Sequence, residues 1–271
     1  MTLFENTNQI DLLLFTPDPE FARQAEAAGI NGIIIDWEQK DKGDRQQKYD
    51  TEINKDTVED LQHIRAAVSL PVTVRINGLH PETEDEINSA VDNGADVIML
   101  PMAESAADVE KFMALLDDRA QAIIQIETQS LVEQCEELRS LPWDAAYIGL
   151  NDLMISRGAD SLWTPLIDGT IEHIYSVLSG RRVGFGGITI IGGGAPIPFT
   201  GLLREMAYYN CDLSFLRRTF RKEIEGRSIQ DEIAAVRAAW TAARSRSELV
   251  SETDHLAFRQ FLIKHLNVES E

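Results

Sequence analysis

The sequence predicts a (β/α)8 TIM barrel with extra C-terminal helices. Short apolar segments alternate with longer helical patterns along the chain, and the repeats average about 29 residues, which matches the unit size of this barrel. Segments such as residues 33–35 and 97–100 are continuously apolar, which is typical of strands buried on both faces of a parallel sheet. An open doubly wound sheet is the alternative, but no glycine-rich fingerprint follows the first strand.

The predicted elements follow from these segments and from the residues between them. Helices are expected at 19–28, 57–68, 82–92, 106–116 and 130–138. Gly29 and Gly94 fit two helix ends because glycine tolerates a positive φ, and Pro142 ends the last of the five. Ser105 is expected to cap its helix, with Asp108 completing a capping box. Strands are expected at residues 10–15, 32–36, 72–76, 96–100, 122–127, 145–149, 183–187 and 212–216.

Two regions depart from a simple barrel repeat. The polar segment 38–50 is long for a βα loop, which suggests a substrate role, although a solvated surface loop is the alternative. After residue 216 the chain holds more than one barrel helix, and it is expected to divide near residues 245–253, leaving an amphipathic helix at 255–266. We therefore predict a TIM-barrel catalytic domain at 1–245 and a C-terminal helical extension at 246–271. The extension packs either on its own barrel or on a neighbouring subunit.

The composition is that of an acidic globular protein. The formal charge of −20 disfavours nucleic acids and anionic membrane surfaces as partners. No segment approaches roughly 18 consecutive apolar residues, and the N-terminus lacks a basic segment followed by an apolar one, so a cytoplasmic protein is expected. Cys135 and Cys211 lie far apart and outside any metal-binding motif, which predicts reduced, buried thiols.

Polar side chains follow several predicted strands at the end where a TIM barrel carries its active site. Gln125 and Glu127 flank one apolar residue, so both point to the same face of their strand. If that face is the barrel interior, burying them costs about a few kcal/mol each unless a partner is present. The complete predicted rim comprises Asp36, Glu38, Arg75, Asn77, Pro101, Gln125, Glu127, Asn151, Asp152 and Arg217.

Glu127 and Asp152 follow neighbouring predicted strands and are expected to bind one divalent cation. Two carboxylates, waters and substrate oxygens form the oxygen-rich octahedral set that suits Mg²⁺ or Mn²⁺. Two alternatives remain, namely Glu127 paired with Arg75 for structure alone and Asp152 acting as a helix N-cap. A zinc site is not expected, because no histidine ends a predicted strand; surface positions are expected for His63, His80, His173, His255 and His265.

Arg75 lies at the end of a predicted strand inside the barrel, where anions must match its charge. Its planar guanidinium suits a carboxylate bidentately, which predicts contact with a small acid substrate. A structural ion pair with Glu38 or Glu127 is the alternative, and one arginine can do both.

Five segments in this order resemble the HpcH/HpaI aldolase and citrate lyase β-subunit family of the phosphoenolpyruvate/pyruvate superfamily. They read DWE at 36–38, VRIN at 74–77, GADVIMLP at 94–101, QIET at 125–128 and GLNDL at 149–153. The resemblance implies a barrel with Mg²⁺ or Mn²⁺ on Glu127 and Asp152, and Arg75 in contact with an oxo-acid. It also implies Gln125 near the metal and a C-terminal helix exchanged between subunits of a homo-oligomer.

The chain departs from this family at Gln39. Aldolase members carry Asp-x-Glu-His at this point, with the histidine as acid or base, and citrate lyase-like members carry Asp-Leu-Glu-Asp. Glutamine does not titrate, so the acid or base has to be Glu38, a water on the metal or a residue of 40–47.

The sequence therefore predicts a divalent-metal-dependent carbon–carbon lyase or aldolase that acts on a small 2-oxo acid, of the pyruvate-enolate type, or on its hydroxy adduct. One alternative is an acyl-CoA lyase like the citrate lyase β-subunit, taking an acyl thioester, and another is a non-catalytic barrel that binds an oxo-acid. The predicted catalytic residues are Arg75 and Glu38, the predicted substrate contacts are Arg75, Gln125, Asn77 and Asp36, and the predicted metal ligands are Glu127 and Asp152.

Two glycine clusters, at 184–187 and 192–194, are expected to form flexible rim loops. A phosphate cradle is the alternative, but neither cluster continues into a glycine fingerprint or a Lys-Ser/Thr pair.

Overall fold

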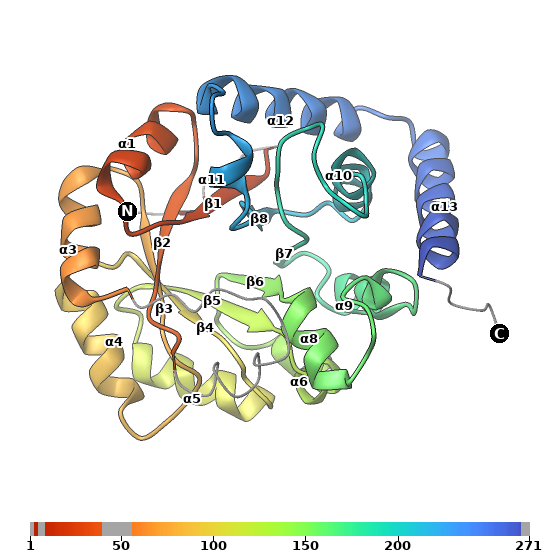
Figure 1. The fold of residues 1–271 in the computed structure, drawn as a ribbon. Coiled ribbons are helices and arrows are strands. Elements are labelled where there is room, and N and C mark those ends of the chain that lie inside the picture. The colour runs from red at the N-terminus through yellow and green to blue at the C-terminus, as the bar shows by residue number, and fades with distance from the viewer. Residues whose placement is uncertain (1–2, 5–8, 40–55, 267–271) are drawn as a thin grey trace.

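The computed structural model describes residues 3–4, 9–39 and 56–266. Eight parallel strands form a nearly closed barrel surrounded by helices, which confirms the predicted TIM barrel (Figure 1). Each strand begins and ends within two residues of its predicted bounds. The strands are β1 (Asp11–Phe15), β2 (Gly32–Asp36), β3 (Val72–Arg75), β4 (Val97–Leu100), β5 (Gln121–Ile126), β6 (Ala145–Ile148), β7 (Arg182–Phe185) and β8 (Leu213–Phe215).

The barrel closes between β7 and β8, at the two ends of the strand order. An isolated parallel bridge joins Ile188 to Leu216 beyond β7, and the Ile188 N–H donates to the Phe215 carbonyl at 2.8 Å. Gly184 permits this closure, because a Cβ there would collide with the carbonyl oxygen of Leu213. The expectation of a flexible loop over 184–187 is therefore wrong for residues 184 and 185, which lie within β7.

Several predicted helices begin at side-chain caps, and the one cap predicted from the sequence, Ser105, is among them. Asp18 caps α1 (Pro19–Ala27), Thr57 caps α3 (Val58–Ala67), and Ser105 caps α5 (Ala106–Leu116) with the predicted Asp108 capping box. The helix expected at 130–138 is instead two short ones, because Gln134 leaves helical geometry between them. The remaining helices are α4 (Thr83–Asp92), α6 (Gln129–Glu133), α7 (Cys135–Leu138), α8 (Leu150–Arg157), α9 (Thr170–Val177), α10 (Phe199–Tyr208), α11 (Phe220–Glu223), α12 (Ile229–Arg244) and α13 (Glu248–His265), with a 3₁₀ turn at Thr164–Leu166.

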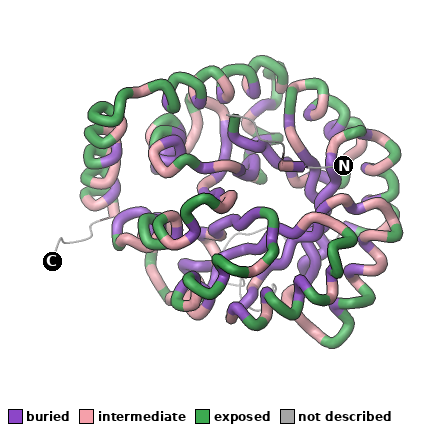
Figure 2. The backbone as a smooth tube through the Cα atoms, turned by 180° about the vertical axis from the view of Figure 1, so that it is seen from behind, coloured by how far each residue is buried: buried purple, intermediate pink, exposed green. Residues whose placement is uncertain are grey.

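Two hydrophobic cores result from this arrangement. The larger fills the layer between the strands and the outer helices, and the smaller lies inside the barrel. Figure 2 shows the buried backbone concentrated in the strands, with exposed residues along the outer helices. Cys135 and Cys211 are buried free thiols, as predicted.

An aromatic cluster forms part of the inner core. Tyr147 of β6 stacks on Phe215 of β8 with 3.7 Å between ring centroids, and Phe15 of β1 meets Phe215 edge-on at 5.4 Å. The Tyr147 hydroxyl donates to the Gly186 carbonyl at 2.6 Å. These rings connect strands on both sides of the β7–β8 closure.

The C-terminal helix α13 packs beside α10 of the same chain (Figure 1). It begins at Glu248 with Ser247 as its N-cap, so the interruption after α12 is shorter than the expected 245–253. His255 is buried in the contact with α10 and pairs with Glu205 at 2.9 Å, so its predicted surface position is wrong. Within the described residues, no helix combines the length and the apolar character needed to cross a membrane.

Candidate functional site

Arg75 and Asp36 form the centre of a buried polar cluster at the carboxyl ends of the strands. The β2–β3 register places the two residues side by side. Arg75 Nε donates to Asp36 Oδ1 at 2.9 Å, and Nη2 donates to Oδ2 at 2.7 Å. The Arg75 fork, predicted for a substrate carboxylate, is therefore occupied by Asp36, itself a predicted substrate contact.

Glu38 supplies a second anion to the same guanidinium. Its Oε2 lies 3.2 Å from Arg75 Nη1, and its side chain is 2% exposed. Burial alone would lower the pKa of Arg75, but the charges of Glu38 and Asp36 raise it above its ordinary value. Arg75 consequently stays positively charged, and the structural ion pair weighed for Glu38 is present.

Gln125 connects Arg75 to Glu127. Its Oε1 accepts from Arg75 Nη1 at 3.5 Å, and its Nε2 donates to Glu127 Oε2 at 3.0 Å. The backbone N–H of Met102, which has a φ of 54°, donates to Glu127 Oε1 at 2.9 Å. Gln125 and Glu127 are buried on the inner side of β5, as their alternation predicts.

Glu127 carries a charge that its surroundings oppose. Burial raises the pKa of its carboxyl group well above the ordinary value, and the negative charges of Asp152 and Glu38 raise it further. Arg75 and the Met102 N–H lower the pKa but do not reverse the shift. The site therefore favours an additional positive charge beside Glu127.

Asp152 lies in the first turn of α8, near enough for its charge to act on Glu127. It is not the N-cap, because Gly149 holds that position, so the capping alternative is wrong. Gly149 also lets Glu127 pack directly on the start of α8: a Cβ there would lie 2.8 Å from Glu127 Cβ and would clash with its carboxylate. The structure thus brings together the two residues predicted to bind metal.

The donor set fits Mg²⁺ or Mn²⁺. Glu127 and Asp152 offer carboxylate oxygens only, and the excess negative charge at Glu127 would be relieved by a hard cation. In the described part of the chain, no three His, Cys, Asp or Glu side chains gather into a complete metal cage. Waters and substrate oxygens would therefore complete the coordination, which is the usual habit of Mg²⁺.

Asn77 holds the neighbouring backbone. Its Oδ1 accepts from the Gln39 N–H at 2.9 Å, and its Nδ2 donates to Glu86 Oε1 at 2.5 Å. This arrangement fixes the segment that carries Glu38. Residues 40–47, considered for an acid or base, lie outside the described residues. Arg217, from the predicted rim, directs its Nε to the Gly187 carbonyl at 3.1 Å.

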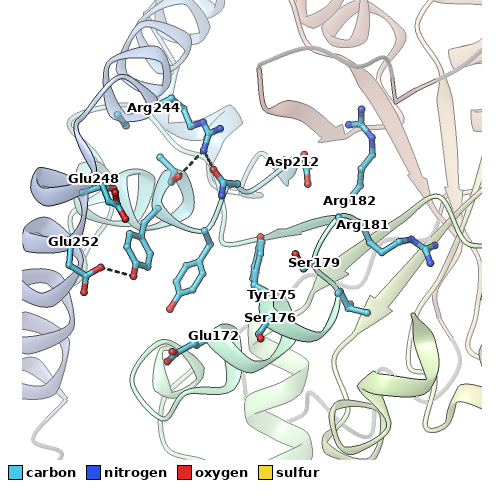
Figure 3. Close-up of a pocket in the computed structure, with 18 of the residues that line it drawn as sticks. Glu172, Tyr175, Ser176, Ser179, Arg181, Arg182, Asp212, Arg244, Glu248 and Glu252 are labelled. Carbon is cyan, nitrogen blue, oxygen red and sulfur yellow. Dashed lines mark hydrogen bonds between the residues drawn. The ribbon is translucent and has the colours of Figure 1, made fainter. Parts of the chain in front are cut away.

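A separate cavity of about 1030 Å³ lies near the opposite end of the barrel (Figure 3). It reaches the amino-terminal ends of β7 and β8 at Arg182 and Asp212, and α9, α10 and α13 contribute to its walls. Several of its polar groups already have protein partners: Tyr208 donates to Glu252 at 2.8 Å, and Arg244 donates to the Ala207 carbonyl at 3.2 Å. A TIM barrel carries its active site at the carboxyl ends of the strands, so this cavity at the amino ends is not the candidate active site.

Three contributors to the site were not expected from the sequence. Met102 and Gly149 hold Glu127, and Asp56 accepts a hydrogen bond from the backbone of Asp36. The segments GADVIMLP and GLNDL border or contain two of them, but a backbone contact leaves no side-chain signal. Asp56 follows a long polar segment without a helical or strand periodicity, so its position in the fold could not be predicted from the sequence.

Comparison with known proteins supports the fold and the site region. A family model described as HpcH/HpaI aldolase/citrate lyase matches residues 11–163, which include all the residues of the polar cluster. No curated protein matches the chain.

Solved structures share the fold at low sequence identity. CitE from Mycobacterium tuberculosis, in complex with magnesium and acetoacetate, is 19% identical over 93% of this chain and 100% of that chain, with a TM-score of 0.62. An HpcH/HpaI aldolase/citrate lyase family protein from Burkholderia cenocepacia J2315 is 17% identical over 89% and 96%, with a TM-score of 0.59. RipC from Yersinia pestis is 19% identical over 90% and 99%, with a TM-score of 0.57.

The family match covers more than half of the 271 residues and contains the whole Arg75–Glu127–Asp152 cluster. The chain belongs to the HpcH/HpaI aldolase/citrate lyase family.

Proposed function

We propose that the protein is a divalent-metal-dependent carbon–carbon lyase or aldolase that acts on a small 2-oxo acid or its hydroxy adduct. The observation that carries the proposal is the buried Glu127 carboxylate, whose raised pKa results from burial and from the facing charges of Asp152 and Glu38. A cation held between Glu127 and Asp152 would lie beside the permanently charged Arg75.

Glu127 and Asp152 would hold Mg²⁺ or Mn²⁺, and Gln125 orients Glu127 through its 3.0 Å hydrogen bond. The magnesium in the Mycobacterium tuberculosis CitE complex agrees with this oxygen-only donor set. When bound, the metal would supply Lewis-acid polarisation of the substrate's oxo group.

Arg75 would stabilise the negative charge that develops on the same substrate. Asp36 holds Nε and Nη2, and Nη1, which is shared between Gln125 and Glu38, would be the nitrogen that faces the substrate. Glu38 lies 3.2 Å from this nitrogen, and it would be the carboxylate that accepts a proton. In cleavage, Glu38 would take the proton of the substrate hydroxyl, the carbon–carbon bond would break, and its electron pair would pass to the oxo-acid fragment. Asn77 contributes by fixing the Gln39 backbone beside Glu38.

The test is metal-dependent exchange of the pyruvate methyl protons with deuterated water, together with decarboxylation of oxaloacetate. Both activities are expected with Mg²⁺ or Mn²⁺, and both should be lost in Glu127→Gln and Asp152→Asn. Glu110→Gln is the matched control, because Glu110 is an exposed carboxylate on α5 outside the site. Absence of both activities in the metal-loaded wild-type protein would reject the proposal. Stabilisation by CoA thioesters instead would favour the acyl-CoA lyase, and pyruvate binding without exchange would favour a non-catalytic barrel.

We also propose a homo-oligomer, supported by the surface of α13. Leu249, Val250, Leu256 and Phe261 are large apolar side chains on this helix, and Leu249 is 77% exposed. Light scattering coupled to gel filtration should give a mass above 30.3 kDa. Leu249→Ser/Leu256→Ser should reduce that mass.

A further inference from the structure

Residues at the start of α3 form hydrogen bonds to the end of β2, next to the Arg75–Asp36 pair. Asp56 Oδ2 accepts the backbone N–H of Asp36 at 2.8 Å, and the Trp37 indole donates to the Thr57 carbonyl at 3.3 Å. Asp56 is buried, and Asp36 is completely buried. Thr57 itself is fixed as the N-cap of α3.

The early end of β1 explains why the Asp36 N–H requires an acceptor from outside the sheet. In a parallel strand the backbone groups of successive residues bond alternately to the two neighbouring strands. Thr16 donates to the Ile34 carbonyl at 3.2 Å on the β1 side, and Trp37 donates to the Arg75 carbonyl at 2.9 Å on the β3 side. The Asp36 N–H therefore faces the β1 side, where β1 has already ended at Phe15. Asp56 provides the acceptor that a longer β1 would have supplied.

Asp36, whose backbone is held by Asp56, in turn holds the Arg75 side chain. Its carboxylate holds Nε and Nη2 of Arg75 at 2.9 and 2.7 Å, and Oδ1 also accepts the Glu38 N–H at 3.2 Å. A shift of the Asp36 backbone would therefore move both Arg75 and Glu38. We propose that Asp56 is a positioning residue that fixes Asp36 and thereby sets the direction in which Arg75 Nη1 and Glu38 face the substrate. The substrate part of this inference rests on the proposed function, whereas the effect on Arg75 geometry does not.

Protonation of Asp56 should weaken this support. Among the described residues, the charged groups that act on it are Asp36 on β2, Asp60 on α3 and Arg75 on β3. Burial is the main cause that raises the pKa of Asp56 to about 6, and the charges of Asp36 and Asp60 add to it. As the pH falls through about 6, the carboxylate becomes a weaker acceptor for the Asp36 N–H, and the apparent affinity for an oxo-acid should fall.

Two substitutions separate positioning from general stability. Asp56→Asn keeps an oxygen acceptor but does not titrate, whereas Asp56→Ala removes the acceptor. Asp144→Ala is the matched control, because Asp144 Oδ2 accepts the Ala122 N–H at 2.7 Å, beside β5 at the opposite end of the barrel. Asp144→Ala should lower the melting temperature without changing the KM for pyruvate.

The expected result is a rise of about tenfold in the pyruvate KM of Asp56→Ala, with a smaller change in kcat, since small displacements of a binding group cost that much or more. Asp56→Asn, a neutral acceptor like protonated Asp56, should have a KM between those of wild type and Asp56→Ala, close to that of wild type below pH 6, and should lose the pH dependence near 6. Crystal structures of metal-free Asp56→Ala and wild type supply a readout without activity, in which the Arg75–Asp36 fork should be displaced. An unchanged fork in Asp56→Ala would overturn the inference even in an active enzyme. Conversely, a displaced fork in a protein that lacks exchange activity would support positioning while rejecting the proposed function.

Discussion

Glu127 places an ionisable group almost completely inside the barrel, with Asp152 and Glu38 acting on it as further negative charges. Its pKa is raised above the ordinary value of 4.5, so the folded protein binds more protons than the unfolded chain between these two pKa values. This group's contribution to the free energy of unfolding is therefore largest below pH 4.5 and is lost as the pH rises through the folded-state pKa. Three buried or half-buried carboxylates on one side of Arg75 store electrostatic repulsion that a cation can relieve.

The first prediction concerns this repulsion. Mg²⁺ at saturating concentration should raise the melting temperature by about 5 °C at pH 8 and by clearly less at pH 5, where protons compete for Glu127. Glu127→Gln should remove the Mg²⁺ effect and, without metal, should raise the free energy of unfolding at pH 8, because the buried negative charge is gone. Differential scanning calorimetry at both pH values measures these quantities. Equal stabilisation of wild type and Glu127→Gln by Mg²⁺ would contradict the assignment.

The second prediction concerns Gly149. Gly149→Ala should push the Glu127 carboxylate away from α8, because the added Cβ would meet the glutamate side chain. The affinity for Mn²⁺ should fall by about tenfold or more, as for other changes that disturb metal ligands. Titration followed by electron paramagnetic resonance measures the free Mn²⁺. Gly158→Ala is the control, since a Cβ at this glycine, the C-cap at the other end of α8, meets nothing within 4 Å, although its φ of 61° adds backbone strain. Normal Mn²⁺ affinity in Gly149→Ala would count against the tight contact.

The residues of the site were predictable where strand alternation alone decides direction. Gln125 and Glu127 point inward for that reason, and Arg75 required a buried anion. The partner of the Arg75 fork was not predictable, because it depends on the β2–β3 register that sets Asp36 opposite Arg75. Register is decided by packing across the whole sheet, and no short segment of the sequence reports it.

At the scale of elements, the α10–α13 contact contains a buried ion pair. His255 lies 2.9 Å from Glu205 and stacks on Tyr208 with 4.2 Å between ring centroids. The hydrogen bond to Glu205 raises the pKa of His255 above 6.5, although burial opposes the shift. Its contribution to stability is therefore complete below about pH 6.5 and is lost as the pH rises through the raised pKa.

The third prediction follows from this pair. His255→Ala should destabilise the docking of α13 by about 3 kcal/mol at pH 6, because Glu205 would stay buried without its cation. The loss should be smaller at pH 9, where His255 is neutral in the wild type. Hydrogen exchange of α13 amides, followed by mass spectrometry, measures the local stability. Adding Glu205→Gln should recover part of the loss, and a double variant as unstable as His255→Ala would argue against the ionic contribution.

Elements were predictable where their signals are local. The cap at Ser105 and the apolar strands depend on a few adjacent residues, and the structure confirms both. The start of α13 was missed because Leu249 and Val250 lie on its exposed side and therefore break the buried apolar period. His255 was placed on the surface because the sequence does not show that α10 provides an acid opposite it.

At the scale of the whole molecule, the formal charge of −20 produces general self-repulsion. The fourth prediction is that raising NaCl from 0.05 to 0.5 M increases the melting temperature at pH 8 by about a few degrees, because salt screens these repulsions. Near the sequence pI of about 4.6 the net charge is small, so the same addition should have little effect. Thermal scans at the two pH values distinguish screening from a general salt effect. An equal response at both would point to the latter.

The barrel itself was predictable from the sequence because it repeats one unit, but its closure was not. Each strand pairs with its neighbour in sequence order, except at the junction of β7 and β8. That junction depends on Gly184 lying against the Leu213 carbonyl, a contact between residues almost thirty positions apart. The glycine cluster suggested mobility because the sequence does not show which backbone approaches it.

The Tyr147, Phe215 and Phe15 rings pack against one another inside the barrel at this junction. Because β8 has only three residues, few backbone hydrogen bonds hold it in the sheet. The stacked and edge-on ring contacts link β6 to β8 and β8 to β1 directly. Because Tyr147 both stacks on Phe215 and donates to the Gly186 carbonyl, a motion that parts β7 from β8 would break at least one of these contacts. The same rings fill the barrel interior next to Arg75, whose guanidinium lies 5.0 Å from the centre of the Phe15 ring, so they exclude water from that side of the polar cluster.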